Sequence, residues 1–299
     1  MQTDFSHLLP LLIECSDRVR DAVIGAEHAR FHEIVGIGAD GASTSRIDEV
    51  AEGAALMCLE TADVPGNVLS EEVGFVDHGS SVTFIVDPID STSNATASSV
   101  LDNGWMNGAS SIESSAGLPH TSGMFGFPYF AFSIAAMVDD QLVAACVRNL
   151  PTGDLFTAVA GQGARYNGTP VRVTPVNTID EAWVALIRPG KDEGLRRARE
   201  IIFNARRIRI TGCSALDIAL ISTGALHALV NPNAHRPPNS GEKVVDYAGG
   251  QLILQEAGGI ITDTEGRPLP IDHDLVRLTP VLAASTPELH QALMASIDP

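Results

Sequence analysis

The sequence predicts an α/β protein in which helices and sheets alternate in layers, an αβαβα sandwich. Two observations lead to this fold class. The first half of the chain has two amphipathic helices followed by short apolar segments separated by turn residues, which is typical of helices packed on an antiparallel sheet. The second half alternates strand and helix segments, as a second layered unit requires. With 299 residues, 44% of them hydrophobic, the chain is long enough to bury a large core.

The first half begins with an amphipathic helix over residues 5–26, in which Leu8, Leu12, Val19 and Val23 recur at helical spacing. A glycine-rich turn, GIGADGAST, connects it to the second helix, and a series of strands follows. The predicted elements are the helix 45–60 and strands at 68–70, 82–87, 129–137, 141–150, 153–159 and 164–173.

The second half alternates the two kinds of element. Its predicted strands are 183–188, 207–210, 225–230, 259–262 and 280–284, and its helices are 191–204, 214–223, 243–257 and 287–297. The change of pattern predicts an N-terminal part, 1–176, with a metal site and a C-terminal α/β part, 177–299. Segment 95–126 fits neither part, because it is rich in Ser, Gly and Ala and lacks periodicity; such long loops are usually functional or disordered.

The charge balance limits the choice of partner. The chain has 19 Lys and Arg against 37 Asp and Glu, a net charge of −18. A field of that sign repels nucleic acids and anionic membranes, so we expect neither as a partner, whereas a small phosphorylated substrate held through a metal is compatible. We find no signal peptide or membrane-spanning apolar stretch. The cysteines lack ligand spacing, so we expect buried thiols in a reducing cytoplasm: Cys15, Cys58, Cys146 and Cys213.

The most informative segment is FIVDPIDSTSN, residues 84–94. Its apolar half predicts a buried strand that ends at Asp87, and Asp90 follows closely. The Ser91-Thr92-Ser93 run suits the start of a helix or turn, whose free N–H groups would face an anion. Two carboxylates beside an anion site repel each other and a phosphate. Mg²⁺ removes both repulsions, because it takes oxygen ligands and bridges to phosphate.

Two further acidic segments fit the same site. Glu71 and Glu72 follow a short predicted strand, and Asp246 lies near the start of a predicted helix. Taken singly, each has an ordinary structural explanation: a Glu pair is usually a solvated turn, a D-x-x-D is a turn or cap, and an Asp at a helix start is a cap or dipole partner. Their occurrence together, in this order, favours a metal centre.

These motifs together resemble the inositol monophosphatase superfamily of Mg²⁺-dependent, Li⁺-sensitive phosphatases. The family pattern of G-E-E, D-P-[IL]-D-G-T-x-N and D-x-[AT]-[AG]-G is matched by residues 70–72, 87–94 and 246–250. Other similar segments are 39–41, 44–48, 127–131, 161–164, 212–215 and 256–259. Within the superfamily, the chain is most similar to the archaeal branch, whose members act on inositol monophosphate and fructose 1,6-bisphosphate. The segments that carry this similarity are ADG (39–41), TSRID (44–48) and VVD (244–246). The resemblance implies the sugar-phosphatase version of the layered fold and, usually, a homodimer.

The resemblance also implies a centre that holds two or three Mg²⁺ ions. A first ion would be held by Glu71, Asp87 and the carbonyl oxygen of Ile89. A second would be held by Asp87, Asp90 and Asp246, and a weaker third by Glu71 with water molecules. We expect direct in-line attack of activated water on phosphorus, without a phosphoenzyme.

The resemblance further implies that the catalytic groups are Asp48, Glu71 and Thr92. Thr92 and Asp48 would orient and deprotonate the attacking water, and the N–H groups of Ser91 and Thr92 would cradle the phosphate. An arginine-rich segment has an ordinary interpretation as a solvated helix face, and an alternative one as a site for a second phosphate. In the second case the expected contact is Arg207 or Arg209, just before the Gly212 turn. Ser214, in the segment 212–215 that is similar to the family, is a further expected contact to phosphate or substrate.

The chain departs from the family pattern in informative places. Ser91 stands where the family has Gly; it is strained if the backbone needs a positive φ, and harmless or an added contact if only its N–H is needed. Ser70 and Val245 replace a Gly and a Trp and leave the ligands intact. The insertion 95–126 arises from the phosphate loop, so we expect either a lid or a disordered or dimer-contact loop; the lid residues would be Trp105, Met106, Asn107 and His120.

The sequence therefore predicts a Mg²⁺-dependent phosphomonoesterase that acts on a small polyol or sugar phosphate. Two alternatives stay open. One is a nucleotide 3′-phosphatase, of the kind that acts on 3′-phosphoadenosine 5′-phosphate, against which the low aromatic content of 5% counts mildly. The other is a catalytically idle homologue with a binding or regulatory role, which the complete set of carboxylates disfavours.

Overall fold

The computed structural model describes residues 4–97, 127–190, 192–233 and 241–297. The insertion, including all of its expected lid residues, lies almost entirely outside the described residues. The helices are α1 (Leu9–Gly25, preceded by the 3₁₀ turn Ser6–Leu8), α2 (Arg46–Glu60), α3 (Thr92–Thr96), α4 (Asp192–Asn204), α5 (Ser214–Ile221), α6 (Val244–Glu256) and α7 (Pro287–Ser296).

Two sheets separate the helices into layers. In spatial order, the first sheet contains β10 (Thr169–Val171), β9 (Ala164–Tyr166), β8 (Leu155–Val159), β7 (Gln141–Asn149), β6 (Ala131–Val138), β5 (Val82–Asp90), β3 (Asn67–Ser70) and β4 (Gly74–Val76). It is antiparallel except for the parallel pair β3–β5. The second contains β12 (Arg207–Arg209), β11 (Trp183–Leu186), β13 (Ala228–Val230), β15 (Val281–Ala284) and β14 (Ile260–Asp263).

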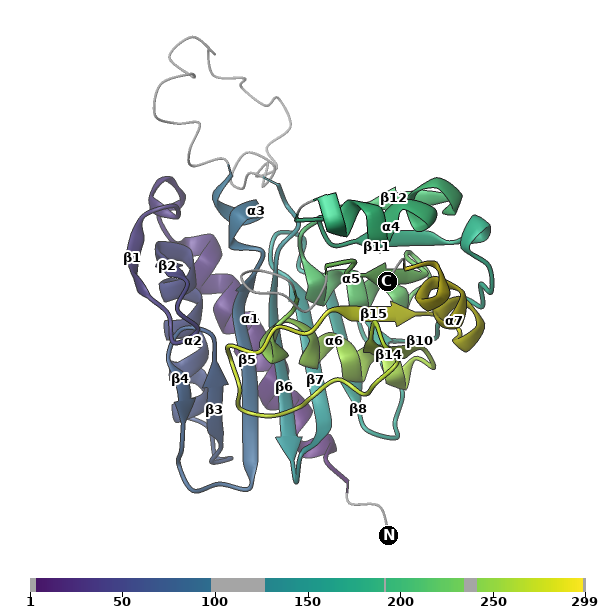
Figure 1. Cartoon of the computed structure of the whole chain (residues 1–299). Coiled ribbons are helices and arrows are strands. Elements are labelled where there is room, and N and C mark those ends of the chain that lie inside the picture. Colours follow the sequence, from purple (N-terminus) through teal and green to yellow (C-terminus); the bar gives the residue numbers. More distant parts are fainter. Residues whose placement is uncertain (1–3, 98–126, 191, 234–240, 298–299) are drawn as a thin grey trace, which may run out of the picture.

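The layers stack in the predicted αβαβα order (Figure 1). Helices α1 and α2 cover one face of the first sheet, α5 and α6 lie between the two sheets, and α4 and α7 cover the far face of the second sheet. Each interface has its own buried apolar cluster, and the central one, around α5 and α6, contains side chains from both sheets. Burial on both faces explains why the central strands β6 and β7 are apolar almost throughout.

The predicted elements differ from the structure in three places. The glycine-rich turn belongs to a two-stranded ribbon, β1 (Ile34–Ile37) and β2 (Ser43–Ser45), which the polar strand β2 concealed. The edge strand β4 was missed because it has only three residues. The predicted strand 164–173 is a hairpin instead, because Asn167 and Gly168 both adopt positive φ angles, 47° and 77°, and reverse the chain.

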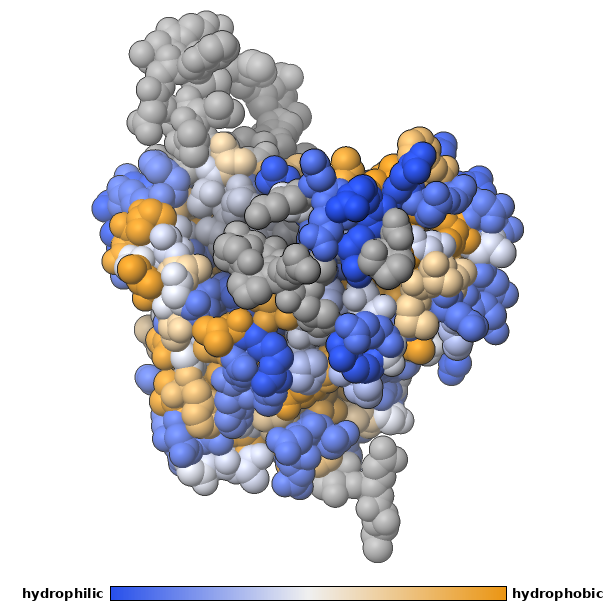
Figure 2. Space-filling model, viewed as in Figure 1, coloured by the Kyte–Doolittle hydropathy of each residue, from blue (hydrophilic) through white to orange (hydrophobic). Residues whose placement is uncertain are grey.

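The surface is uneven in polarity. Hydrophilic residues dominate the region over α4 and β12, at the upper right of Figure 2. This region contains the arginine-rich segment, residues 196–209. Apolar surface appears over the β1–β2 ribbon at the left, where Ile34 and Ile37 are 65% and 78% exposed. Within the described part of the chain, no helix has the length and apolar character needed to cross a bilayer. All four cysteines are buried and free.

Candidate active site

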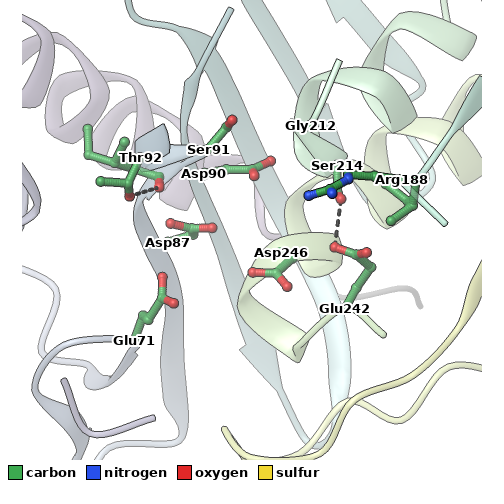
Figure 3. A pocket seen from close by; sticks show the side chains of 12 residues that line it. Glu71, Asp87, Asp90, Ser91, Thr92, Arg188, Gly212, Ser214, Glu242 and Asp246 are labelled. Atoms are coloured by element: carbon green, nitrogen blue, oxygen red, sulfur yellow. Dashed lines mark hydrogen bonds between the residues drawn. The ribbon is translucent and has the colours of Figure 1, made fainter. Parts of the chain in front are cut away.

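An acidic pocket of about 250 Å³ lies at the ends of strands from both sheets and at the starts of α5 and α6. Figure 3 shows four carboxylates directed toward a common space between β5 and α6, with an arginine and a fifth carboxylate, that of Glu242, on the opposite side. The described residues that line the pocket are Glu71, Asp87, Ile89, Asp90, Ser91, Thr92, Ile187, Arg188, Gly212, Ser214, Glu242 and Asp246.

A bulge at the end of β5 brings Asp87 and Asp90 to the same side of the sheet. In a regular strand, residues three apart point to opposite faces. Here Asp87 pairs with Ser133 and Asp90 with Ala131, so β5 has one residue more than β6 in this interval. The predicted end of the strand at Asp87 was therefore wrong, because pairing resumes after Pro88, which has no N–H to donate.

Asp87 is the most deeply buried of these carboxylates, at 1% exposure. Its Oδ1 has no hydrogen-bond partner among the described residues. Burial raises the pKa of Asp87 well above its usual range, and the charges of Glu71, Asp90 and Asp246 raise it further. A buried carboxylate oxygen without a partner is costly unless a cation or proton satisfies it.

The neighbouring carboxylates are perturbed in the same direction. Burial, together with the charge of Asp246, raises the pKa of Glu71 to about 7. Burial, with the charge of Glu242 next, raises the pKa of Asp246 to about 7. The pKa of Asp90 is also raised by burial, although the backbone N–H of Ala215 donates to its Oδ2 at 2.6 Å. The cluster therefore favours either protons or a cation.

Lys243 supplies one cation to this cluster. It lies immediately before α6, and its Nζ donates to Glu71 Oε1 at 2.6 Å and to Asp40 Oδ2. Asp40 lies in the β1–β2 turn and is only 1% exposed at its side chain. The backbone N–H groups of Ala39 and Asp40 donate to the carbonyl oxygens of Glu72 and Glu71. Lys243 thus connects the glycine-rich turn, the end of β3 and the start of α6.

Asp48 and Thr92 form a second polar unit at the edge of the pocket. Thr92 Oγ1 donates to Asp48 Oδ1 at 2.8 Å and lies 3.2 Å from the carbonyl oxygen of Ile89. The other carboxylate oxygen of Asp48 accepts from the N–H and Oγ of Ser45, which fixes it in the first turn of α2. Burial raises the pKa of Asp48. The two residues expected to handle the attacking water are therefore in direct contact.

The opposite side of the pocket is formed by the second sheet and its helices. Ser214 Oγ donates to Glu242 Oε2 at 2.6 Å, and Asn231 Nδ2 donates to Glu242 Oε1 at 3.1 Å. Arg188, which follows β11, directs its guanidinium group toward Ser214 (Figure 3). This side thus offers a hydroxyl, a carboxylate and a guanidinium for substrate groups other than the phosphoryl group.

The predicted arginines Arg207 and Arg209 do not line this pocket in the described structure. They lie on the edge strand β12, where Arg207 Nη1 donates to the carbonyl oxygen of Arg206. The guanidinium carbon of Arg209 is 4.9 Å from the ring centroid of Trp183, a cation–π contact that explains its orientation. Arg188 was not predicted, because a single arginine after a strand carries no pattern.

The structure shows which backbone conformation Ser91 adopts, which the sequence left open. Its φ is 76° and its ψ is 54°, in the left-handed region that favours glycine. The backbone at this position therefore needs a positive φ, and Ser91 is strained. Ser91 lies between Asp90 and Thr92 and lines the pocket with both of them.

The donor set fits a hard divalent cation. Carboxylates and backbone carbonyls are the ligands that Mg²⁺ prefers, and Asp87 Oδ1 needs a positive partner. In the part of the chain that the structure describes, no group of three or more His, Cys, Asp or Glu side chains is arranged to hold a metal ion as it stands. To act as a metal ligand, Glu71 would have to leave or share its ion pair with Lys243.

A family model described as the inositol monophosphatase family matches residues 22–298. The chain belongs to the inositol monophosphatase family. It is 28% identical to the fructose-1,6-bisphosphatase/inositol-1-monophosphatase of Methanothermobacter thermautotrophicus, over 99% of both chains. It is 31% identical to the bifunctional NADP phosphatase/NAD kinase of Methanocaldococcus jannaschii, over 95% of this chain and 49% of that protein.

Solved structures show the same fold. A crystal structure of an inositol monophosphatase–fructose 1,6-bisphosphatase superposes with a TM-score of 0.75, at 20% identity, over 96% of this chain and 98% of that one. The predicted family and its layered fold are confirmed. The similarity to archaeal relatives also agrees with the predicted archaeal branch.

Sequence reasoning missed three residues at this pocket: Glu242 and Arg188 line it, and Lys243 lies at one of its edges. Asp40, in the ADG segment, was expected to contribute to the metal site on the strength of the resemblance, and it lies at the pocket edge as the partner of Lys243. The position of Glu242, four residues before Asp246, was a signal in the sequence, because the segment before a ligand-bearing helix borders the same cavity.

Proposed function

We propose that this protein is a Mg²⁺-dependent phosphomonoesterase that hydrolyses a small polyol or sugar phosphate, such as inositol monophosphate or fructose 1,6-bisphosphate. One observation carries the proposal: four carboxylates from three separate segments, two buried and two half-buried, face one pocket, and the deepest has an oxygen without a described partner. Such a cluster is unfavourable for folding and suits a site that exists to bind cations. Family membership and the names of the archaeal relatives support it.

The metal ligands in this proposal are Glu71, Asp87, the carbonyl oxygen of Ile89, Asp90 and Asp246. Bound Mg²⁺ would neutralise the carboxylates, coordinate a phosphoryl oxygen and lower the pKa of water. We propose two or three ions, the number that the resemblance to the family implies.

Thr92 and Asp48 would orient and deprotonate the attacking water. Thr92 Oγ1 already donates to Asp48 Oδ1, so its lone pairs are free to accept a hydrogen bond from water and orient it toward phosphorus. As water attacks, its proton passes to Asp48 through Thr92, the new P–O bond forms, and the bond to the substrate oxygen breaks. The leaving alkoxide takes a proton from solvent. The backbone N–H groups of Ser91 and Thr92 would face the phosphoryl group.

The remaining pocket wall would select the leaving group. Glu242 is buried and can accept hydrogen bonds from substrate hydroxyls, as it does from Ser214. Arg188 suits an additional anionic group on the substrate. A nucleotide phosphatase is the second candidate, because a relative of 31% identity carries the name NADP phosphatase/NAD kinase.

Phosphate release from a panel of substrates tests the proposal. The panel contains inositol monophosphate, fructose 1,6-bisphosphate, NADP and 3′-phosphoadenosine 5′-phosphate, each with Mg²⁺ and with EDTA. Asp90→Asn should lower turnover at least about 100-fold, because a ligand charge is lost. Asp180→Asn, a substitution on the exposed 3₁₀ turn before β11, is the matched control and should retain activity. Turnover that is unaffected by EDTA would contradict the proposal.

Two finer features stay proposals. We propose a homodimer, as is usual in the family, and light scattering coupled to size exclusion measures it directly. We also propose a cytoplasmic location. Four buried free cysteines suit a reducing compartment, and fractionation of the native host would test the location.

A further inference from the structure

Ser91 combines two unfavourable features at one position of the pocket. Its backbone has a positive φ of 76°, which an L residue adopts at a cost and glycine adopts freely. The other described non-glycine residues with positive φ are Asp139, Asp140 and Asn167. Those are Asp and Asn residues in hairpin turns, where this conformation is common. Ser91 is a different case, because it lies at the pocket and is neither Asp nor Asn.

The side chain of Ser91 has no structural task that explains the strain. A serine before a helix usually caps it, but Ser91 makes no side-chain cap bond to α3. Its Oγ is buried and lacks a hydrogen-bond partner in the described part of the chain. A buried hydroxyl without a partner lowers stability, and glycine would remove both costs. Strained residues with unmet polar groups are concentrated at functional sites.

The hydroxyl lies at the edge of the pocket space, beside Gly212. Figure 3 shows the Ser91 side chain extending from the end of β5 toward Gly212. A Cβ atom on Gly212 would lie 3.6 Å from Ser91 Oγ, so residue 212 places no side chain against the hydroxyl, which would have to turn from its buried position to reach a substrate. Asp90, Thr92 and Ser214 line the same space.

We propose that Ser91 is a specificity-determining residue whose Oγ hydrogen-bonds to an oxygen of the bound phosphorylated substrate. The bond would satisfy the hydroxyl only in the complex, so the strain in the free protein serves substrate binding. The proposal rests on the proposed function. The oxygen belongs either to the phosphoryl group or to the alcohol next to it, and the experiment distinguishes these two positions.

Two substitutions separate the hydroxyl from the strain. Ser91→Gly removes both, whereas Ser91→Ala removes only the hydroxyl. We expect Ser91→Gly to raise the melting temperature by about 2 °C, and Ser91→Ala to change it less. Both variants should lower kcat/KM for the preferred substrate by about 3- to 10-fold, as expected for the loss of one hydrogen bond. Ser93→Ala, on the exposed neighbouring serine, is the matched control.

Binding of inorganic phosphate in the presence of Mg²⁺, measured by calorimetry, locates the contact. If both variants also weaken phosphate binding, Ser91 contacts the phosphoryl group. If phosphate binding is unchanged while kcat/KM falls for one substrate more than for another, it contacts the alcohol. The proposal is overturned if Ser91→Gly and Ser91→Ala both match the wild type within twofold in phosphate binding and in kcat/KM. Failure of the proposed function is a separate result, since it appears as absent phosphate release by the wild type.

Discussion

Replacement of Lys243 by methionine should strengthen Mg²⁺ binding. The ammonium group donates to Glu71 Oε1 at 2.6 Å, and Glu71 is a proposed metal ligand. A hydrogen bond between charged groups contributes about 1.5–3 kcal/mol, which corresponds to about 10- to 100-fold in affinity. The side chains of Lys243 and Glu71 are 19% and 21% exposed, so solvent weakens the pair. We therefore expect Lys243→Met to bind Mg²⁺ about tenfold more tightly.

The gain should depend on pH in a defined direction. Glu71 and Asp246 each have a pKa of about 7, and the charge of Lys243 lowers both values. Loss of that charge raises both pKa values, so protons compete more strongly with Mg²⁺ near neutral pH. A larger share of both groups is ionised at pH 8.5 than at pH 6.5, so the gain should be larger at pH 8.5 and should shrink or vanish at pH 6.5. Titration calorimetry at the two pH values measures this.

A second cation deletion controls for net charge. Arg277→Met removes one positive charge from an exposed ion pair with Asp272 and Asp274, and it should leave Mg²⁺ affinity near the wild-type value. The reasoning is refuted if Lys243→Met binds Mg²⁺ at pH 8.5 no more tightly than Arg277→Met does. In that case Lys243 would not compete for Glu71, and its main effect would be to hold the β1–β2 turn through Asp40.

Three further predictions concern the same pocket. Asp48→Asn should lower kcat by about 10²- to 10⁴-fold, with Mg²⁺ affinity by calorimetry near wild type, because proton acceptance is lost and no ligand is. Arg188→Met should lower kcat/KM for a bisphosphate about tenfold more than for a monophosphate, whereas Arg209→Met should change neither. Without Mg²⁺, the melting temperature should decrease as the pH rises from about 5 to about 8. Stability from the raised pKa of groups such as Glu71 and Asp246 is lost as they ionise, and excess Mg²⁺ should abolish that slope.

Strong periodic patterns in the sequence were enough to predict the layers. The helical spacing around Leu12 and Val19 predicted α1, and apolar runs between turns predicted β6 and β7. Weak or short elements were beyond this reasoning. The β1–β2 ribbon has only three or four residues in each strand, and β2 is polar, so no alternation distinguishes it from a loop. The hairpin at Asn167 and Gly168 did have a signal in the sequence. An Asn-Gly pair favours a hairpin turn more strongly than the surrounding residues favour a continuous strand over 164–173.

The candidate site was partly predictable for a similar reason. Asp87 and Asp90 are close in sequence, so their proximity was evident, but their common orientation depends on a bulge that pairing with β6 creates. The contact between Lys243 and Asp40 joins residues 203 positions apart and depends on how the two sheets meet at α6. The sequence left two interpretations open for the arginine-rich segment, residues 196–209, because the number of arginines does not reveal on which edge of the sheet they lie. Arg209, for example, lies over Trp183.

The position of the carboxylates explains how this fold tolerates them. Asp87 and Asp90 are buried and Asp246 is half-buried, all near the ends of elements whose other residues pack in large apolar clusters, so their repulsion acts at one edge of the core. Backbone donors hold two of them: Ala215 N–H for Asp90, and Lys243 N–H for Asp246 at 2.7 Å. Asp87 lacks such a donor within the described structure. A cation that binds this pocket should therefore act most strongly on Asp87, which makes Asp87 the position where metal affinity and stability are most closely linked.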